Sequence, residues 1–282
     1  MGKQKRSENT YQKINTLYKR DVNNVIMQHY DWSCKEFEYL RSLLWDTTEK
    51  IDGTNMRIEV IQTPIFDENN TDIIKGVMFN VNIKGKTDNA NIPNHLEKYM
   101  KETFTDDVVF NALGISEYIP IEEWHEHGWC ISKEDKTPVY DKIPLKYTIY
   151  GEGYGMKIQK CGGRYRRDSV SFIGFDVKVN ETYLLRDNAM SVLEKLGCET
   201  VPYFGQMTID QAIEMVRNGF ISEISEDRTL MAEGVVLSSP LGLKNRRGER
   251  LIVKIKYEDF VKYRNKYGTD EKVEQIPNPS FS

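Results

Sequence analysis

Lys50 stands two residues before Asp52 and three before a glycine in the segment 48–55, on an expected tight turn ahead of a strand. A lysine amine attacks phosphorus only when neutral, and its ordinary pKa of about 10.4 leaves fewer than roughly one in a thousand neutral near pH 7. Desolvation or neighbouring cations must therefore lower that pKa. Lys254 and Lys256 alternate on an expected strand, so they share a face and could supply the positive charge. The pattern indicates phosphoryl transfer, although Lys50 seen alone is more simply an exposed turn lysine.

Three carboxylates are candidates to hold a divalent cation beside that amine. Such a cation repels the lysine proton and neutralises phosphate oxygens. Glu152 lies between glycines, Asp176 follows Phe175 on an expected strand, and Glu233 precedes another. Glu152 seen alone would be a solvated loop carboxylate, and Glu233 a surface residue at the start of a strand.

Two clusters of basic residues could contact nucleic acid. The first surrounds Gly162-Gly163 and includes Tyr165, and an interleaved aromatic suits a phosphate backbone with one stacked base. Its basic members are Lys157, Lys160, Arg164, Arg166 and Arg167. The second comprises Lys244, Arg246, Arg247 and Arg250. The alternatives are a solvated loop for the first cluster and a basic hairpin turn for the second.

The elements that would position these residues alternate between strand and helix patterns. Segment 56–60 alternates apolar residues with Arg57 and Glu59 and predicts a half-buried strand, joined by a hairpin loop at 67–72 to a strand at 76–84. Further strands are expected at 145–149, 169–179, 235–237 and 251–257, and helices at 93–104 and 209–218. Segment 191–196 is expected to be the end of a helix that stops at Gly197. Thr208 and Gly219 bound the last helix. We therefore predict an α+β fold of mostly antiparallel sheets flanked by helices.

Composition sets outer limits on the class of protein. The 282 residues carry a net charge of -4, which disfavours a general polyanion binder and favours a local nucleic-acid patch. No run of 18 apolar residues and no secretory signal occurs. The scattered cysteines Cys34, Cys130, Cys161 and Cys198 are expected to be free thiols. His125, His127 and Cys130 lack a second ligand pair, so zinc is not expected. We expect a flexible segment 1–9 and a single domain over 10–282.

Five segments, in order, resemble the covalent nucleotidyltransferase motifs of ATP-dependent ligases, and most closely those of the nick-sealing, phage-encoded RNA ligases. They span 48–55, 150–155, 172–177, 232–236 and 251–256, and the resemblance extends over about 11–260. It implies the ATP-grasp-like adenylation fold of ligases. It also implies ATP as co-substrate with Mg²⁺ or Mn²⁺. The residues after Lys256 are too few for an OB-fold, so none is expected.

The resemblance also implies roles for individual residues on the nucleotide. Lys50 would become adenylylated, with Glu49 close to adenine. Glu152 would bind the ribose hydroxyls and Phe175 would stack on the base. Lys254 and Lys256 would hold the phosphates.

The remaining implied roles concern the metal and the nucleic acid. Glu233 and Asp176 would organise the metal ion, and Asn55 would help recognise the 5′-phosphate. Lys86 stands in the segment Gly85–Asp88, at the position where relatives carry arginine. Lysine keeps the positive charge but cannot bind a phosphate through two parallel N–H groups as arginine does. The alternative is that Lys86 is merely an exposed loop residue. Asp52 stands where some relatives carry histidine. The segment Tyr18–Asp21 resembles an N-terminal sequence motif of the phage relatives. This segment could contact a phosphate or an RNA end, or it could be a surface turn.

The implied function is ATP-dependent sealing of RNA 5′-phosphate and 3′-hydroxyl ends through lysyl-AMP and an adenylylated end, as in RNA repair. The RNA could be a single strand, a duplex or a nick. Two alternatives stay open: transfer of AMP to DNA ends or to a protein, and a non-catalytic 5′-end or nucleotide-binding module. A monomer in the cytoplasm of a bacterium or a phage-infected host is expected.

Overall fold

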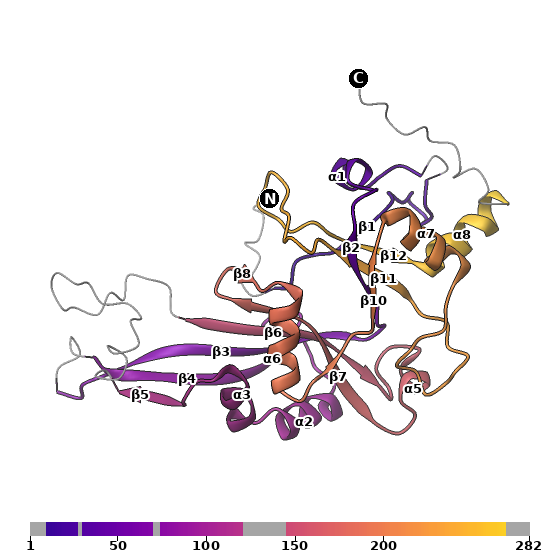
Figure 1. Cartoon of the computed structure of the whole chain (residues 1–282). Helices are drawn as coiled ribbons and strands as arrows, with labels where there is room; N and C mark the ends of the chain where they lie inside the picture. Colours follow the sequence, from indigo (N-terminus) through magenta and orange to yellow (C-terminus); the bar gives the residue numbers. More distant parts are fainter. Residues whose placement is uncertain (1–9, 28–29, 70–73, 121–144, 269–282) are drawn as a thin grey trace. The chain divides into compact units, whose positions relative to one another are not determined.

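The computed structural model describes residues 10–27, 30–69, 74–120 and 145–268, which form two compact units. Unit 1 comprises Met1–Tyr11 and Gly53–Thr200, and unit 2 comprises Gln12–Asp52 and Val201–Ser282. Each unit contains its own sheet with helices, which confirms the α+β prediction (Figure 1). No described helix is long and apolar enough to cross a membrane. The single-domain boundary at 10–282 stays a prediction.

The sheet of unit 1 has the strand order β5-β4-β3-β6-β7-β8, with β9 pairing in parallel to β7 and the other pairs antiparallel. Its strands are β3 (Thr54–Phe66), β4 (Ile74–Gly85), β5 (Tyr118–Pro120), β6 (Lys146–Gly155), β7 (Val170–Val179), β8 (Thr182–Tyr183) and β9 (Glu199–Thr200). β3 and β4 pair as the predicted hairpin, although part of the predicted loop 67–72 lies outside the described residues. The predicted strand 145–149 extends to Gly155, so Glu152 lies within a strand.

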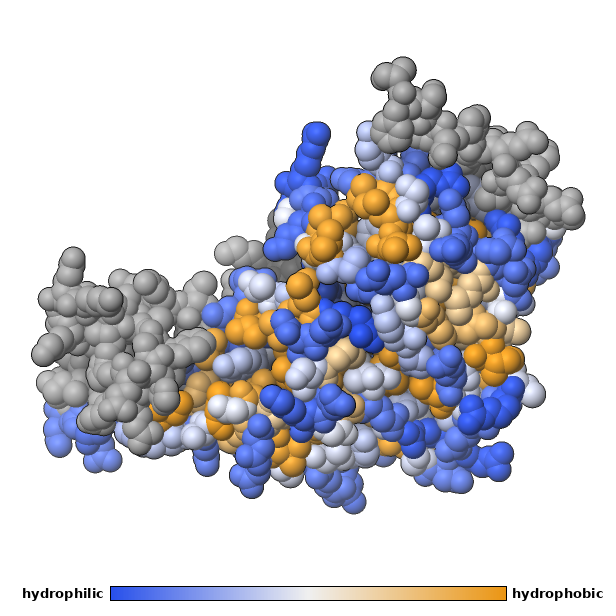
Figure 2. Space-filling view, in the orientation of Figure 1, coloured by the Kyte–Doolittle hydropathy of each residue, from blue (hydrophilic) through white to orange (hydrophobic). Residues whose placement is uncertain are grey.

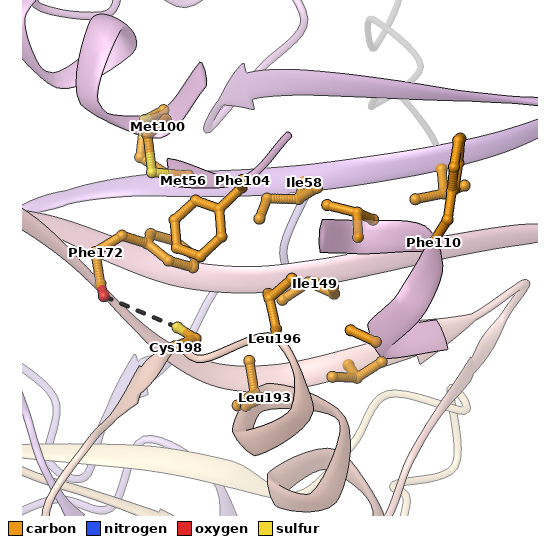
Figure 3. Packing of buried hydrophobic residues seen from close by; sticks show 14 of the residues in the cluster. Met56, Ile58, Met100, Phe104, Phe110, Ile149, Phe172, Leu193, Leu196 and Cys198 are labelled. Atoms are coloured by element: carbon orange, nitrogen blue, oxygen red, sulfur yellow. Dashed lines mark hydrogen bonds between the residues drawn. The ribbon is translucent and has the colours of Figure 1, made fainter. Parts of the chain in front are cut away.

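The helices of unit 1 are α2 (Asn94–Thr103), α3 (Asp106–Leu113), α5 (Gly162–Tyr165) and α6 (Arg186–Lys195). Buried side chains of α2, α3 and α6 join those of the strands in one hydrophobic core. Figure 3 shows its centre, where the rings of Phe104 and Phe172 meet edge to face with centroids 5.4 Å apart. Met56 and Met100 lie above this pair, and Cys198 lies below it (Figure 3).

The sheet of unit 2 has the order β1-β12-β11-β2-β10, with β1 parallel to β12 and the other pairs antiparallel. Its strands are β1 (Asn15–Thr16), β2 (Trp45–Glu49), β10 (Tyr203–Met207), β11 (Gly234–Ser238) and β12 (Ile252–Lys256). The helices are α1 (Lys35–Tyr39), α7 (Ile209–Asn218) and α8 (Tyr257–Tyr267). The predicted start of α7 is confirmed: Gln211 N donates to Thr208 Oγ1 at 3.2 Å, and Thr208 N donates to Gln211 Oε1 at 2.9 Å.

Three local predictions were wrong. Tyr257 begins α8 instead of ending a strand. The strand around Arg57 and Glu59 is not half-buried, because both charged side chains have 0% exposure. Tyr165 has 1% exposure and packs on Tyr154 with ring centroids 5.9 Å apart, so it cannot stack on a base.

The exposed side chains are mixed in character. Charged residues make up 29% of the sequence, and hydrophilic side chains dominate the face in Figure 2, with smaller apolar patches between them. The expected free thiols are confirmed for Cys34, Cys161 and Cys198. His125, His127 and Cys130 lie outside the described residues.

Candidate active site

Three neighbouring strands of unit 2 bring the predicted lysines together. Lys50 follows β2 directly, and its backbone N–H donates to Gly234 O at 2.9 Å. β12 pairs on the other edge of β11, with Lys256 opposite Gly234. Lys254 and Lys256 are separated by the buried Ile255, so both point to the opposite face of β12. The antiparallel pairing therefore brings Lys50 close to Lys254 and Lys256, although about 200 residues separate them in the sequence.

Glu233 lies between two of these lysines. Lys50 Nζ is 2.6 Å from Glu233 Oε2 and also donates to Ile51 O at 3.3 Å. The other carboxylate oxygen, Oε1, forms an ion pair with Lys256. The three side chains have exposures of 21%, 17% and 22%, so the pairs are screened less than fully exposed ones.

Lys254 is the most perturbed cation of this group. Burial first, and then the charges of Lys50 and Lys256, lower the pKa of Lys254 to about 8, although Glu233 opposes the shift. Lys254 therefore still carries its proton at neutral pH but loses it near pH 8, well below the range of an ordinary lysine. Such a group of cations is a suitable site for a phosphate chain.

The carboxylates of unit 2 fit a magnesium-type ion. Burial raises the pKa of Asp52, and the charge of Glu233 adds to that shift, so the two carboxylates lie within electrostatic range. No group of three or more His, Cys, Asp or Glu residues that could hold a metal occurs among the described residues. Mg²⁺ usually binds through one or two carboxylates plus substrate phosphates and water. Glu233, assisted by Asp52, is a donor set of that kind.

The carboxylate of Glu49 is occupied inside unit 2. It is 1% exposed, and burial raises its pKa. Ser222 Oγ donates to Oε1, and Glu223 N donates to Oε2 at 2.9 Å. The side chain therefore anchors the segment 222–223, and its contact with adenine stays a prediction.

Glu152 and Asn55 lie opposite each other on β6 and β3 of unit 1. Asn55 Oδ1 is buried and has no hydrogen-bond partner among the described residues. A Cβ on Gly53 would lie 2.4 Å from Gly153 O and 2.7 Å from Glu152 Cγ. Only glycine therefore fits at the turn that precedes β3.

Phe175 and Asp176 contact a residue that sequence reasoning missed. Tyr11 Oη donates to Asp176 Oδ2 at 2.5 Å, and the Tyr11 ring meets Phe175 edge to face at 5.1 Å. It also packs against Tyr150 at 5.0 Å. Asp176 is 9% exposed, and its role as a metal ligand stays a prediction.

Lys86 is exposed on the turn that follows β4, and a buried arginine supports that turn. Arg57 donates to Gly85 O, pairs with Asp88, and pairs with Glu59 Oε1 at 2.7 Å. Sequence reasoning missed Arg57 because it appeared to belong to a solvated strand face. The Arg57 guanidinium thus binds the backbone of the segment Gly85–Asp88, the segment in which relatives carry an arginine.

The first basic cluster has four exposed members and one half-buried member. Lys157, Lys160, Arg164 and Arg167 are exposed. Arg166 pairs with Glu199 and lies over the ring of Tyr154 at 5.5 Å.

The second cluster forms the hairpin turn that the sequence offered as an alternative, with Lys244 bridged to Arg250 and Asn245 N bonded to Glu249 O at 2.8 Å. In the segment Tyr18–Asp21, Arg20 and Asp21 bind Asp259 and Lys266 of α8.

These sheets and helices form a nucleotidyltransferase fold of the type found in RNA ligases. The RNA ligase family model matches residues 44–256, and the chain belongs to that family.

Two solved structures of the Naegleria gruberi RNA ligase are similar in fold. One is a lysine-to-alanine variant with ATP and Mn, at 12% identity and a TM-score of 0.50, covering 88% of this chain and 62% of that one. The other is an arginine-to-alanine variant with ATP and Mn, at 14% identity and a TM-score of 0.50, covering 93% and 59%. The chain thus spans less than two thirds of the length of these ligases. No curated protein matches the chain by sequence.

Proposed function

We propose that this protein is an ATP-dependent RNA ligase that joins a 5′-phosphate to a 3′-hydroxyl, with Lys50 as its nucleophile. The observation that carries the proposal is the position of Lys50 beside Glu233, in a group that also contains Lys254 and Lys256. A nucleophile, a metal-binding carboxylate and phosphate-binding cations are the components that phosphoryl transfer requires.

In the first step, Lys50 Nζ attacks the α-phosphorus of ATP. A P–N bond forms, the bond to the bridging β-phosphate oxygen breaks, and pyrophosphate leaves with that electron pair. One ammonium proton goes to solvent before the attack, which the charges of Lys254 and Lys256 favour, and a second leaves the nitrogen for solvent as the P–N bond forms. They also stabilise the charge that develops on the leaving phosphates.

A divalent ion held by Glu233 and Asp52 would neutralise phosphate oxygens. With its carboxylate engaged in this way, Glu233 no longer stabilises the ammonium form of Lys50. The family match and the Mn-containing neighbours support a divalent ion, and we propose Mg²⁺ as the ion used.

In the second step, an oxygen of the RNA 5′-phosphate attacks the AMP phosphorus and the P–N bond breaks. The Lys50 nitrogen takes a proton from solvent and leaves as the free amine. In the third, the 3′-hydroxyl oxygen attacks the 5′-phosphorus, loses its proton to solvent and expels AMP. In unit 1, Phe175 would stack on adenine, Glu152 would bind the ribose, and Asn55 would donate its amide N–H groups to the 5′-phosphate. Asp176 would assist with the metal, and Lys86 with the RNA. We place this activity in the cytoplasm.

Transfer of radiolabel from the α-phosphate of ATP to the protein tests the proposal, with Lys50→Ala as control. We expect label on the wild type only, released into a sealed strand by nicked 5′-phosphorylated RNA. Absence of label with Mg²⁺ and with Mn²⁺ would overturn the proposal. Label that moves only to DNA or to protein would support the alternative acceptor instead.

A further inference from the structure

We propose that the turn between β11 and β12 binds the phosphate backbone of duplex RNA, about six base pairs away from the joining site. This inference deepens the proposed function and rests on it. The turn comprises residues 244–250, here called the basic hairpin, and the proposed function gives it no role. It belongs to unit 2, as do Lys50 and the other lysines of the candidate active site.

Three cations of the basic hairpin have no carboxylate in contact with them. Lys244, Arg246 and Arg247 are exposed, and none of them forms an ion pair with a residue of the described ranges. By contrast, Arg41 and Arg166 each bind a carboxylate. In a chain with a net charge of -4, such a local group of unpaired cations is available to an external polyanion.

Two acids lie near the basic hairpin, and both are engaged in other contacts. Glu249 Oε2 accepts a hydrogen bond from Asn245 Nδ2 at 2.8 Å, so this carboxylate supports the turn. The hydrogen bond from Cys34 Sγ lowers the pKa of Glu36 on α1, and the charges of the two exposed arginines of the hairpin add to that shift. The cations therefore outnumber the acids within their electrostatic range, and this surface stays positive.

Side-chain hydrogen bonds hold the backbone of the basic hairpin in place. Asn245 Oδ1 accepts from the backbone N–H groups of Arg247 and Glu249 at 2.9 and 3.0 Å. At the base of the turn, Gln12 Nε2 donates to Arg250 O at 2.8 Å, and Arg250 N donates to Gln12 Oε1 at 3.2 Å. Because the backbone is ordered before RNA arrives, binding costs less conformational entropy.

The strands that carry the active-site residues lead to the basic hairpin (Figure 1). Gly234 pairs with Lys256 at one end of the β11–β12 ladder, and Ser238 pairs with Ile252 at the end nearer the hairpin. Roughly six residues separate Lys254 from the turn, and at about 3.3 Å per residue they span roughly 20 Å. A duplex rises about 3.4 Å per nucleotide in each strand, so RNA that lies along β12 with its reacting end at the lysines reaches the hairpin after about six base pairs.

The chemistry of the hairpin fits a phosphate backbone rather than base edges. Its cations lie on a turn, and Lys and Arg contacts to phosphates position a duplex without reading its sequence. Such contacts would hold the RNA in register while its ends are joined, whatever the bases.

The test removes charge from the protein and from the RNA at matched places. The triple variant Lys244→Ala/Arg246→Ala/Arg247→Ala is compared with wild type on nicked RNA duplexes that carry a neutral patch. The neutral patch is a run of about four methylphosphonate linkages, which lack the phosphate charge. A series of duplexes places it in each strand of each arm, either next to the nick or about five to eight nucleotides away. Fluorescence anisotropy measures the affinity.

Two control variants accompany the triple variant. The first keeps all three charges by exchanging lysine for arginine, and arginine for lysine, at the three positions. The second is Lys98→Ala/Lys101→Ala, which removes two exposed lysines of α2 that pair with Glu102 and Glu97. Single-turnover formation of lysyl-AMP needs no RNA and reports whether each variant retains its active site.

We expect the distant neutral patch in one arm to weaken binding by wild type about 10-fold, and binding by the triple variant by less than about twofold. On a fully charged duplex the triple variant should bind about 10- to 100-fold more weakly, with a log–log salt slope smaller by about 3. Both controls, and lysyl-AMP formation by all variants, should stay within about twofold of wild type.

Three results would overturn the assignment and leave the hairpin a solvated turn. They are a wild type that is insensitive to every distant patch, a patch effect of equal size in wild type and triple variant, and an equal loss of affinity in the α2 control. A matching fall in lysyl-AMP formation by the triple variant would also count against it, because the hairpin would then act on the ATP step. If wild type forms no lysyl-AMP, the proposed function fails, while the binding comparison still tests the hairpin.

Discussion

Lys50 Nζ lies 2.6 Å from Glu233 Oε2, in an arrangement that stabilises the ammonium form of the lysine. The attacking amine must instead be neutral. Glu233 therefore has two opposing effects: it holds the proton on Lys50 when paired with it, and it supports catalysis when its oxygens bind a metal ion. Which effect dominates decides how a substitution of Glu233 behaves.

We expect Glu233→Gln to lower lysyl-AMP formation by about 100-fold or more, because losing a ligand of the ion outweighs the easier deprotonation of Lys50. The half-saturating Mg²⁺ concentration should rise, as measured by single-turnover adenylylation across a metal titration. Glu97→Gln, which removes an exposed pair with Lys101 at 2.7 Å, is the matched control and should be silent. A faster Glu233→Gln enzyme would show that the carboxylate acts mainly by restraining Lys50.

Pyrophosphate binding should weaken as pH rises through about 8, where Lys254 loses its charge. The pKa of Lys254 is lowered in the folded protein, so between about 8 and the ordinary lysine value the folded state binds fewer protons than the unfolded one. Anion binding is therefore strong below that window and falls within it, by at most about tenfold per pH unit. The contribution of Lys254 to folding stability changes in the opposite direction, because the unfolded state binds more protons, so the free energy of unfolding increases as pH rises through this window.

Calorimetric titration with pyrophosphate from pH 7 to about 9.5 would measure this effect, with Lys254→Arg as control. Arginine stays charged throughout that range, so any pH dependence of binding to the variant comes from the titration of pyrophosphate itself. Parallel pH profiles for wild type and Lys254→Arg would contradict the prediction.

Glu49→Ala should reduce the free energy of unfolding by about 1–3 kcal/mol, because Ser222 Oγ and Glu223 N lose their buried acceptor. Glu49→Gln, which keeps one acceptor oxygen, should lose less. Urea unfolding at neutral pH measures both. If the two variants keep wild-type stability but raise the KM for ATP, the side chain serves the nucleotide rather than the 222–223 segment.

Replacing Lys157, Lys160 and Arg164 together by alanine should weaken RNA binding and flatten its salt dependence by about 3 in the log–log slope. Lysyl-AMP formation should change little, because none of these exposed side chains has a role on ATP or on the metal ion. Fluorescence anisotropy with a nicked RNA duplex at several salt concentrations measures the slope. The variant Lys98→Ala/Lys101→Ala on α2 is the control, and an equal loss there would remove the case for this basic cluster.

Local sequence rules were sufficient for several elements. The two-residue period of a strand placed Lys254 and Lys256 on one face, and the Thr208 capping box marked the start of α7. The turn before β3 followed from glycine at position 53, where a Cβ would meet backbone. These features depend on neighbours in the chain, so their residue types reveal them.

Tertiary structure alone decided which faces are covered and which distant groups meet. Periodicity placed Arg57 and Glu59 opposite the apolar residues of β3, but only packing showed that this face is buried as well. Tyr11 meets Asp176 across 165 residues, Ser222 meets Glu49 across 173, and Arg20 meets Asp259 across 239. Such pairs form because strand order and helix packing bring remote polar groups together, where burial makes each need a partner. A single sequence carries no local signal for that choice.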